Sequence, residues 1–422
     1  MKAVAETSPA GDSPPLPLVL IKAVRLLDVL TGKYLDHAEV LVEGERVKGV
    51  GSPVELPSET TSNLRIIDLG RLTLLPGLID CHTHLMARLP EGPDAYQLSL
   101  LTKSEAFRAL EGAANAKTVL EAGFTTVRDV ESEGSGYSDV ALRNAINAGL
   151  VVGPRMQVAT RGIAALGQYH PFGLSSNLRD FPTGAEMVSG VEESRRAVRE
   201  QVGHGADLIK VYADWNTPTL TVDELRVIVE ETHKLGRKVA AHATTPEGIQ
   251  NAVTAGVDSI EHGSKATLQN LESMKERGVY LVPTVGALEA YISKTGPGPA
   301  SLQAQETLKA AQQTIRQAKE LGVRIANGFD ATGLEFHGRN ADELVVMTKL
   351  GLTPIEAIRS ATVTAAELLA WPDRVGSLEA GKFADLIAVE GDPLVQITTL
   401  QDVRFVMKGG TVVKSSRMPS QP

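Results

Sequence analysis

Short apolar runs alternate with longer amphipathic segments through the middle of the chain. The short runs are typical of buried strands, whereas the longer segments repeat their apolar residues every three to four positions, as helices do. The eight predicted strands are LPGLIDCHTH, FTTVRDV, RMQVAT, ADLIKVYAD, KVAAHA, DSIEHG, YLVPT and RIANGFDA. The alternation indicates βαβ units and an α/β fold, and eight units are the number of a (β/α)8 TIM barrel.

Amphipathic helices are predicted between these strands over residues 101–122, 190–203, 222–236 and 301–322. A further helical pair, 341–351 and 353–370, follows the eighth strand. Pro354 stands at the start of the last helix, where a first-turn proline is tolerated.

Both ends of the chain differ from the middle, because they alternate apolar and polar residues in short runs broken by turns. This pattern predicts a small, discontinuous β-sandwich domain made of residues 18–75 and 375–422, beside a barrel over residues 76–374. Residues 1–17 are rich in Pro, Ser and Gly and are interpreted as a flexible leader. Removal of a longer precursor segment stays open.

Composition narrows the class of partner. The formal net charge is -9 at pH 7, which disfavours nucleic acid or an anionic membrane, because both attract a basic face. The one cysteine cannot form an internal disulfide, and no apolar run reaches the roughly 18 residues of a membrane span. We therefore expect a cytoplasmic protein that acts on a small molecule.

His82 and His84 close the first predicted barrel strand at alternate positions, so their side chains share one face. Two imidazoles on one face can bind one metal ion, although such a pair can equally be two hydrogen-bonded residues in a turn. Asp80, Cys81 and Thr83 make this strand end unusually rich in small polar groups. Their presence favours a metal site.

Lys210 lies in ADLIKVYAD, an otherwise apolar strand in which an ammonium group is costly to bury. Two dications about 4 Å away would each repel it by roughly 8 kcal/mol at an effective dielectric of about 20, which would force the neutral amine. A neutral amine can react with carbon dioxide to form a carbamate, whose two oxygens can bridge two metal ions. The alternative is a lysine that extends its ammonium group to solvent from a strand end.

His242, His262 and Asp330 end the strands KVAAHA, DSIEHG and RIANGFDA. They would gather with the first histidine pair at the C-terminal end of a barrel, where active sites of this fold form. Each histidine alone could be a hydrogen-bonded core residue, and the aspartate could cap a helix. The other five histidines fall in predicted loops or helices: His37, His170, His204, His233 and His337.

Two divalent cations fit this set of donors by charge, because the carbamate, Asp330 and a hydroxide offset most of their positive charge. Such a pair lowers the pKa of bound water to about 7 and polarises a carbonyl group, which are the two requirements of hydrolysis. Imidazole and carboxylate donors suit Zn²⁺, although they also accept manganese, cobalt or nickel.

Nearly the whole chain after the leader resembles the metal-dependent amidohydrolase superfamily, in its branch of imidazolonepropionase-like proteins and Xaa-Pro dipeptidases. The most specific segments are PGLIDCHTHL, GFTTVRDV, HGADLIKVYAD, AHATTPEGIQNAVTAGVDSIEHG, GVRIANGFDA and TPIEAIRSATVTAAELL. The resemblance implies a hydrolase with two metal ions. By position it assigns His82 and His84 to the first metal, His242 and His262 to the second, N6-carboxylysine at Lys210 to the bridge, and Asp330 to a ligand and general base.

The resemblance also places two residues on the substrate side. Tyr212 resembles a tyrosine that donates a hydrogen bond to the substrate or the developing oxyanion, although a core aromatic is an equal alternative. His170, in RGIAALGQYHPFG, is the candidate for the histidine of a segment that usually reads Gly-Gly-His. Gln168 and Tyr169 stand where glycines are commoner, and Phe329 stands where small hydroxyl residues are frequent. These departures leave the substrate open.

The expected reaction is cleavage of an amide bond in a dipeptide or an N-acyl amino acid, with Asp330 moving a proton to the leaving nitrogen. Arg161, Arg339 or another cation in a loop could hold a substrate carboxylate, and no motif selects among them. Alternatives are an amidase for a xenobiotic N-acyl amino acid such as ochratoxin A, and a carbamate or lactone hydrolase. A mononuclear deaminase typically lacks the lysine, and a non-catalytic scaffold would have lost ligands, so both are disfavoured. Relatives commonly assemble, so we expect a homo-oligomer.

Overall fold

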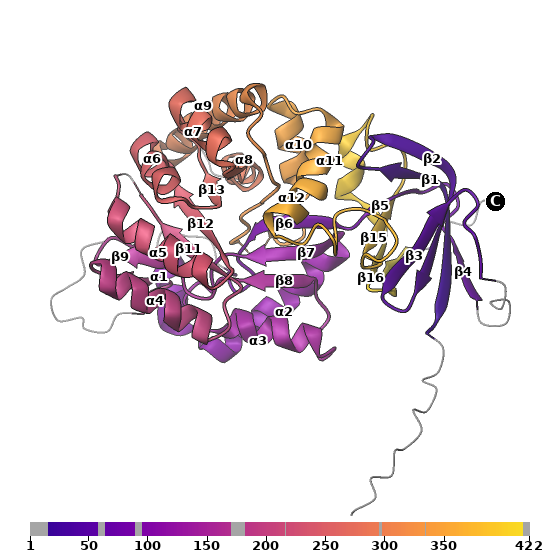
Figure 1. The fold of residues 1–422 in the computed structure, drawn as a ribbon, viewed down its shortest axis with the longest axis horizontal. Coiled ribbons are helices and arrows are strands. Elements are labelled where there is room, and N and C mark those ends of the chain that lie inside the picture. The colour runs from indigo at the N-terminus through magenta and orange to yellow at the C-terminus, as the bar shows by residue number, and fades with distance from the viewer. Residues whose placement is uncertain are drawn as a thin grey trace, which may run out of the picture.

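The computed structural model describes residues 16–57, 64–88, 95–169, 182–215, 217–294, 298–333 and 335–416. Helices and strands alternate in the larger part of the molecule, and strands from both chain ends lie together at one side of it (Figure 1). No helix in the described ranges is long and apolar enough to cross a membrane.

The two chain ends share one sheet. Its strands are β1 (Leu18–Asp28), β2 (Lys33–Glu43), β3 (Arg46–Gly51), β4 (Leu64–Asp68), β5 (Thr73–Pro76), β15 (Leu386–Val389), β16 (Val403–Lys408) and β17 (Thr411–Ser415). The order is β17-β16-β15-β5-β1-β2-β3, and β4 also pairs with β1. Antiparallel pairing of β5 with β15 joins the ends, as the alternating pattern predicts. These hydrogen bonds define a single sheet. The two packed layers of the predicted β-sandwich stay a prediction.

A second group of strands is parallel throughout. It contains β6 (Leu78–Thr83), β7 (Phe124–Asp129), β8 (Arg155–Val158), β11 (Leu208–Tyr212), β12 (Lys238–Ala243), β13 (Ser259–His262) and β14 (Tyr280–Val282). The amide of Asp207 donates to the Val158 carbonyl at 2.7 Å, which connects β8 to the start of β11. Two short strands, β9 (Ile163–Ala165) and β10 (Glu186–Val188), extend the sheet beside β11.

The eighth predicted strand is irregular. Within this described segment, Ile325 forms an isolated parallel bridge with Leu281, and the Cys81 amide donates to the Asn327 carbonyl at 2.8 Å. The segment therefore links β14 back to β6, in an arrangement of the TIM-barrel type. Gly328 lies so close to β6 that an added Cβ would be 2.7 Å from the Cβ of His82, so a larger residue would displace the strand.

Helices cover the parallel strands (Figure 1). They are α1 (Ala95–Thr102), α2 (Glu105–Glu121), α3 (Ser138–Asn147), α4 (Val191–Gly203), α5 (Val222–Lys234), α6 (Pro246–Ala255), α7 (Leu268–Arg277), α8 (Val285–Lys294), α9 (Pro299–Leu321), α10 (Asp342–Lys349), α11 (Pro354–Ser360) and α12 (Val363–Leu368), and a 3₁₀ turn spans Ile397–Gln401. Pro354 occupies the first turn of α11, as predicted.

Two predicted helices are each divided in the structure. Within residues 101–122, the first two residues end α1 and Glu105–Glu121 form α2, because Ser104 begins a new helix by accepting a hydrogen bond from the Phe107 amide. Residues 353–370 form α11 and α12. The carbonyl of Ser360 accepts from the Asn327 amide, and that of Ala361 accepts from the Ile79 amide. These tertiary hydrogen bonds replace the bonds of a continuous helix.

Side chains along β11 alternate between two environments. Leu208 packs inside the ring of strands against Val130, Ala159 and Ala240. Ile209 packs outward in the hydrophobic cluster that the covering helices share. The period of two places Lys210 and Tyr212 on the inner face with Leu208, further toward the C-terminal end of the strand.

Candidate metal centre

A cavity of about 450 Å³ opens at the C-terminal ends of the parallel strands. It is lined by seven of the eight residues that the sequence proposes for the site: His82, His84, Lys210, Tyr212, His242, His262 and Asp330. The eighth, His170, lies outside the described residues. The other described histidines do not line the cavity; His233 pairs with Asp258, for example.

His82, His84 and Asp330 form the tightest part of the group. The two Nε2 atoms are 3.2 Å apart, and Oδ1 of Asp330 is 3.2 Å from Nε2 of His84 and 3.7 Å from Nε2 of His82. Two nitrogens bound to one tetrahedral Zn²⁺ at about 2.0–2.1 Å would be about 3.3 Å apart. The spacing of this pair therefore fits a single metal ion.

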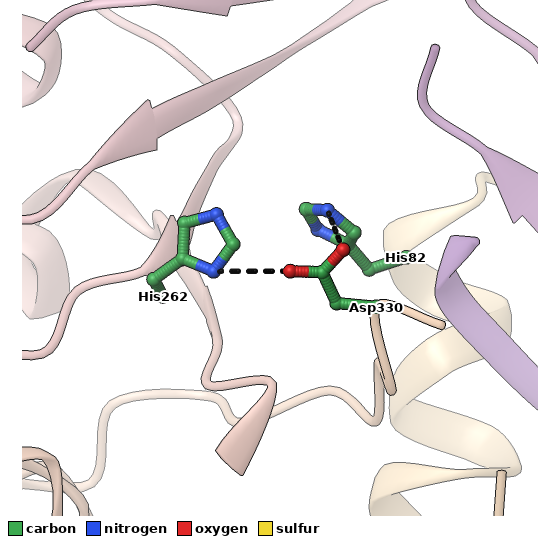
Figure 2. A group of neighbouring side chains, drawn as sticks. All are labelled: His82, His262 and Asp330. Carbon is green, nitrogen blue, oxygen red and sulfur yellow. Dashed lines mark ion pairs between the residues drawn. The ribbon is translucent and has the colours of Figure 1, made fainter. Parts of the chain in front are cut away.

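Asp330 also faces the second pair of histidines. Its Oδ2 is 3.9 Å from Nδ1 of His262, so its two oxygens point to opposite sides of the group (Figure 2). The rings of His242 and His262 are 4.6 Å apart between centroids. Thr284 Oγ1 lies 2.7 Å from Nδ1 of His262 and orients that ring. The carboxylate thus lies where it can contact two sites.

Backbone conformation helps to aim these side chains. Glu133, His262, Thr284 and Asp330 all have positive φ, between 51° and 68°, and all line the cavity. Residues other than glycine rarely adopt this left-handed conformation, and each instance costs of order 1–3 kcal/mol. The strain is concentrated where strand ends turn toward the cavity.

Lys210 is buried, with 1% of its surface exposed. Among the described residues, no carboxylate lies within ion-pair distance of its Nζ and no hydrogen bond holds it. Burial lowers the pKa of Lys210, and the more distant Glu261, Glu131 and Asp330 offset this effect only in part. A buried amine with these properties is suited to the neutral form, which is the form that reacts with carbon dioxide.

The ionisable groups of the centre have shifted pKa values. Burial lowers the pKa of His262 to about 4 and that of His82 well below its usual value, so both rings are neutral and able to bind metal. Burial alone would raise the pKa of Asp330, but the surrounding imidazoles outweigh it and lower the value. For His84, burial favours the neutral ring, but Glu133 and Asp330 raise its pKa in the absence of metal.

Two buried glutamates after β7 were not predicted from the sequence. Glu133 Oε1 is 2.9 Å from Nδ1 of His84, and the Tyr212 hydroxyl donates to Glu131. Tyr169 donates to the same carboxylate at 3.2 Å, and its hydroxyl is 2.7 Å from that of Tyr96. In this arrangement the Tyr212 proton points to Glu131, so a hydrogen bond to substrate requires the hydroxyl to turn.

The predicted carboxylate-binding arginines lie elsewhere. Arg161 donates to the Ala185 carbonyl, and Arg339 pairs with Asp342. Neither lines the cavity, whose described lining contains no arginine. The structure therefore does not bring either arginine to the described cavity lining, and the group that would hold a substrate carboxylate stays a prediction.

The fold is of the TIM-barrel type, and the centre gathers side chains that could bind metal at the C-terminal ends of its strands. The model of the Amidohydrolase family matches residues 73–413. The chain therefore belongs to this family, and it is a hydrolase that acts on carbon–nitrogen bonds. The family is generally metal-dependent.

Relatives support the same assignment. An ochratoxinase from Aspergillus niger is 35% identical over 91% of this chain and 84% of its own. A crystal structure of a Xaa-Pro dipeptidase with bound methionine in its active site has a TM-score of 0.83 and 33% identity, covering 94% of this chain and 99% of that one. The crystal structure of the A. niger ochratoxinase has a TM-score of 0.83 and 29% identity, covering 95% and 96%.

Proposed function

We propose that this protein hydrolyses the amide bond of a dipeptide or an N-acyl amino acid with the help of two divalent metal ions, of which Zn²⁺ fits the donors best. The observation that carries the proposal is the meeting of four imidazoles, the Asp330 carboxylate and a buried lysine amine in a single cavity, where the described residues offer this amine no ion pair. The relatives named above supply the class of substrate.

The residues divide between two metal positions. His82 and His84 would hold one ion, His242 and His262 the other, and Lys210, as N6-carboxylysine, would supply an oxygen to each. Asp330 would complete the set. When bound, the ions would activate water and polarise the substrate carbonyl. The barrel over residues 76–374 contains all six side chains, and residues 18–75 and 375–422 would form the flanking domain.

The chain's own groups perform the remaining tasks. Asp330 reaches both sides of the centre, so it can accept a proton from water and deliver it to the leaving nitrogen. Aromatic side chains form much of the remaining wall and bind apolar parts of a substrate: Tyr96, Tyr169, Tyr212, Trp215, Tyr291 and Phe336. His170 stays a proposed substrate-side residue.

A kinetic panel tests the substrate class. It contains Xaa-Pro and Xaa-Phe dipeptides, ochratoxin A, a carbamate and a lactone, each assayed with zinc-loaded protein. The proposal expects the highest kcat/KM for an amide. Faster turnover of the lactone or carbamate than of every amide would contradict it.

Ochratoxin A is the second candidate substrate within this chemistry. The aromatic wall of a cavity of about 450 Å³ favours an amide with a bulky aromatic group. Preference for ochratoxin A or an Xaa-Phe dipeptide over Xaa-Pro dipeptides would select this candidate.

A further inference from the structure

A buried ion pair lies behind the candidate metal centre. Arg128, on β7, donates to Oε1 of Glu261, on β13, at 2.8 Å, and the two side chains are 2% and 0% exposed. Arg128 also donates to the Cys81 carbonyl at 2.6 Å and to Ser259 Oγ at 3.1 Å. These contacts fix both ions inside the ring of strands.

The second oxygen of the same carboxylate reaches the metal centre. Oε2 of Glu261 is 2.7 Å from Nδ1 of His82. An imidazole that donates its Nδ1 proton to a carboxylate keeps its Nε2 lone pair free. Nε2 of His82 is the atom that lies 3.2 Å from His84 Nε2 and 3.7 Å from Asp330 Oδ1. The carboxylate therefore selects the tautomer that can bind a metal at this position.

Glu261 differs from Glu133, the carboxylate beside His84. Glu133 lines the cavity, where a substrate could reach it, whereas the described lining includes neither Glu261 nor Arg128. A buried ion pair adds little net stability compared with apolar packing of similar volume. The role of this ion pair is therefore better sought in the contact between Glu261 and His82 than in stability.

We propose that Glu261, held in place by Arg128, is a positioning residue that fixes the ring orientation and the tautomer of His82 for metal binding. The proposal rests on the proposed function. Such partners of metal-binding histidines are worth about 10- to 100-fold in metal affinity.

The test compares the full-length zinc protein with Glu261→Gln. Glutamate accepts on both oxygens, but glutamine offers one acceptor and one donor, so either His82 or Arg128 loses its acceptor. We expect zinc affinity, measured by competition with a chelator, to fall by about 10- to 100-fold. We also expect the absorption bands of the cobalt-substituted protein to shift, because the ligand geometry changes.

Asp385→Asn is the matched control. It disrupts another arginine–carboxylate pair with little exposure, in which Arg155 Nε is 2.7 Å from Asp385 Oδ2, at the junction with the chain-end sheet. Its thermal midpoint in EDTA should fall, but its zinc affinity and cobalt spectrum should stay those of wild type. Loss of zinc affinity in this control as large as in Glu261→Gln would overturn the proposal.

Glu261→Asp covers the case in which Glu261→Gln does not fold. Aspartate keeps a negative charge beside Arg128 but draws the carboxylate back by one methylene from His82. We expect this variant to fold and to bind zinc at least about threefold more weakly than wild type. The expected loss of affinity is smaller than the usual 10- to 100-fold because the carboxylate is kept. Wild-type zinc affinity in a folded Glu261 variant overturns this inference alone, whereas a wild-type protein that binds no zinc overturns the proposed function.

Discussion

Replacing Lys210 with methionine should have opposite effects on stability and on metal binding. The Lys210 side chain is buried, and the described residues offer its Nζ no carboxylate at ion-pair distance. Methionine has a similar length and leaves no large cavity. Methionine removes the cost of burying an amine whose charged form is disfavoured, and each pKa unit by which burial lowers the pKa of this group corresponds to about 1.4 kcal/mol. We expect a gain of this order for Lys210→Met in metal-free protein.

The gain should depend on pH. Burial holds the pKa of Lys210 below its value of about 10.4 in the unfolded chain. The unfolded chain therefore binds more protons at pH values between the lowered folded-state pKa and about 10.4, and the wild-type protein becomes more stable as the pH rises through this window. The advantage of Lys210→Met is largest below the folded-state pKa of Lys210 and shrinks as the pH rises toward about 10.4.

Denaturant unfolding in EDTA measures this difference, and elemental analysis of zinc-loaded protein measures the loss of metal. Lys103→Met is the control, because Lys103 pairs with Glu111 at 2.8 Å and donates to the Arg88 carbonyl. That variant should lose about 1 kcal/mol and keep its metal. A clear loss of stability of metal-free Lys210→Met would show that the buried amine stabilises the fold, and two zinc ions retained by this variant would exclude Lys210 as a ligand.

Three further outcomes are expected. Asp330→Asn should lower kcat by about 10²- to 10⁴-fold, because it removes the proton carrier; a kcat within threefold of wild type would assign proton transfer to another group. Removal of metal with EDTA should abolish amide hydrolysis, and added Zn²⁺ should restore it; full activity in metal-free protein would exclude a metal role. Thr353→Ala should destabilise the protein by about 1 kcal/mol, since it removes the capping box with Glu356 at the start of α11; an unchanged unfolding midpoint would show that the cap contributes nothing.

Much of the centre could be predicted because it follows from strand geometry. A side-chain period of two places Lys210 and Tyr212 on one face, and parallel strands bring His242 and His262 to the same end of the sheet. Local sequence determines these positions once the strands are identified.

The missed features depend on contacts between distant segments. Glu133 turns toward His84 through a left-handed backbone conformation in the loop after β7. Glu261 reaches His82 across the ring of strands, and its own sequence position gives no sign of this contact. Its partner Arg128 could have been noticed, because it is a charged residue within the apolar strand FTTVRDV, as Lys210 is within its strand. The break between α11 and α12 likewise arises because amides of other segments donate to the carbonyls of Ser360 and Ala361.

Anomalous diffraction at the zinc edge, from crystals of the zinc-loaded protein, shows whether two metal ions bind among these side chains. We expect two peaks, one beside His82 and His84 and one beside His242 and His262, with density beyond Nζ of Lys210 for a carboxylate between them. An unmodified Lys210, or no anomalous peak among these side chains, would contradict the proposed metal centre.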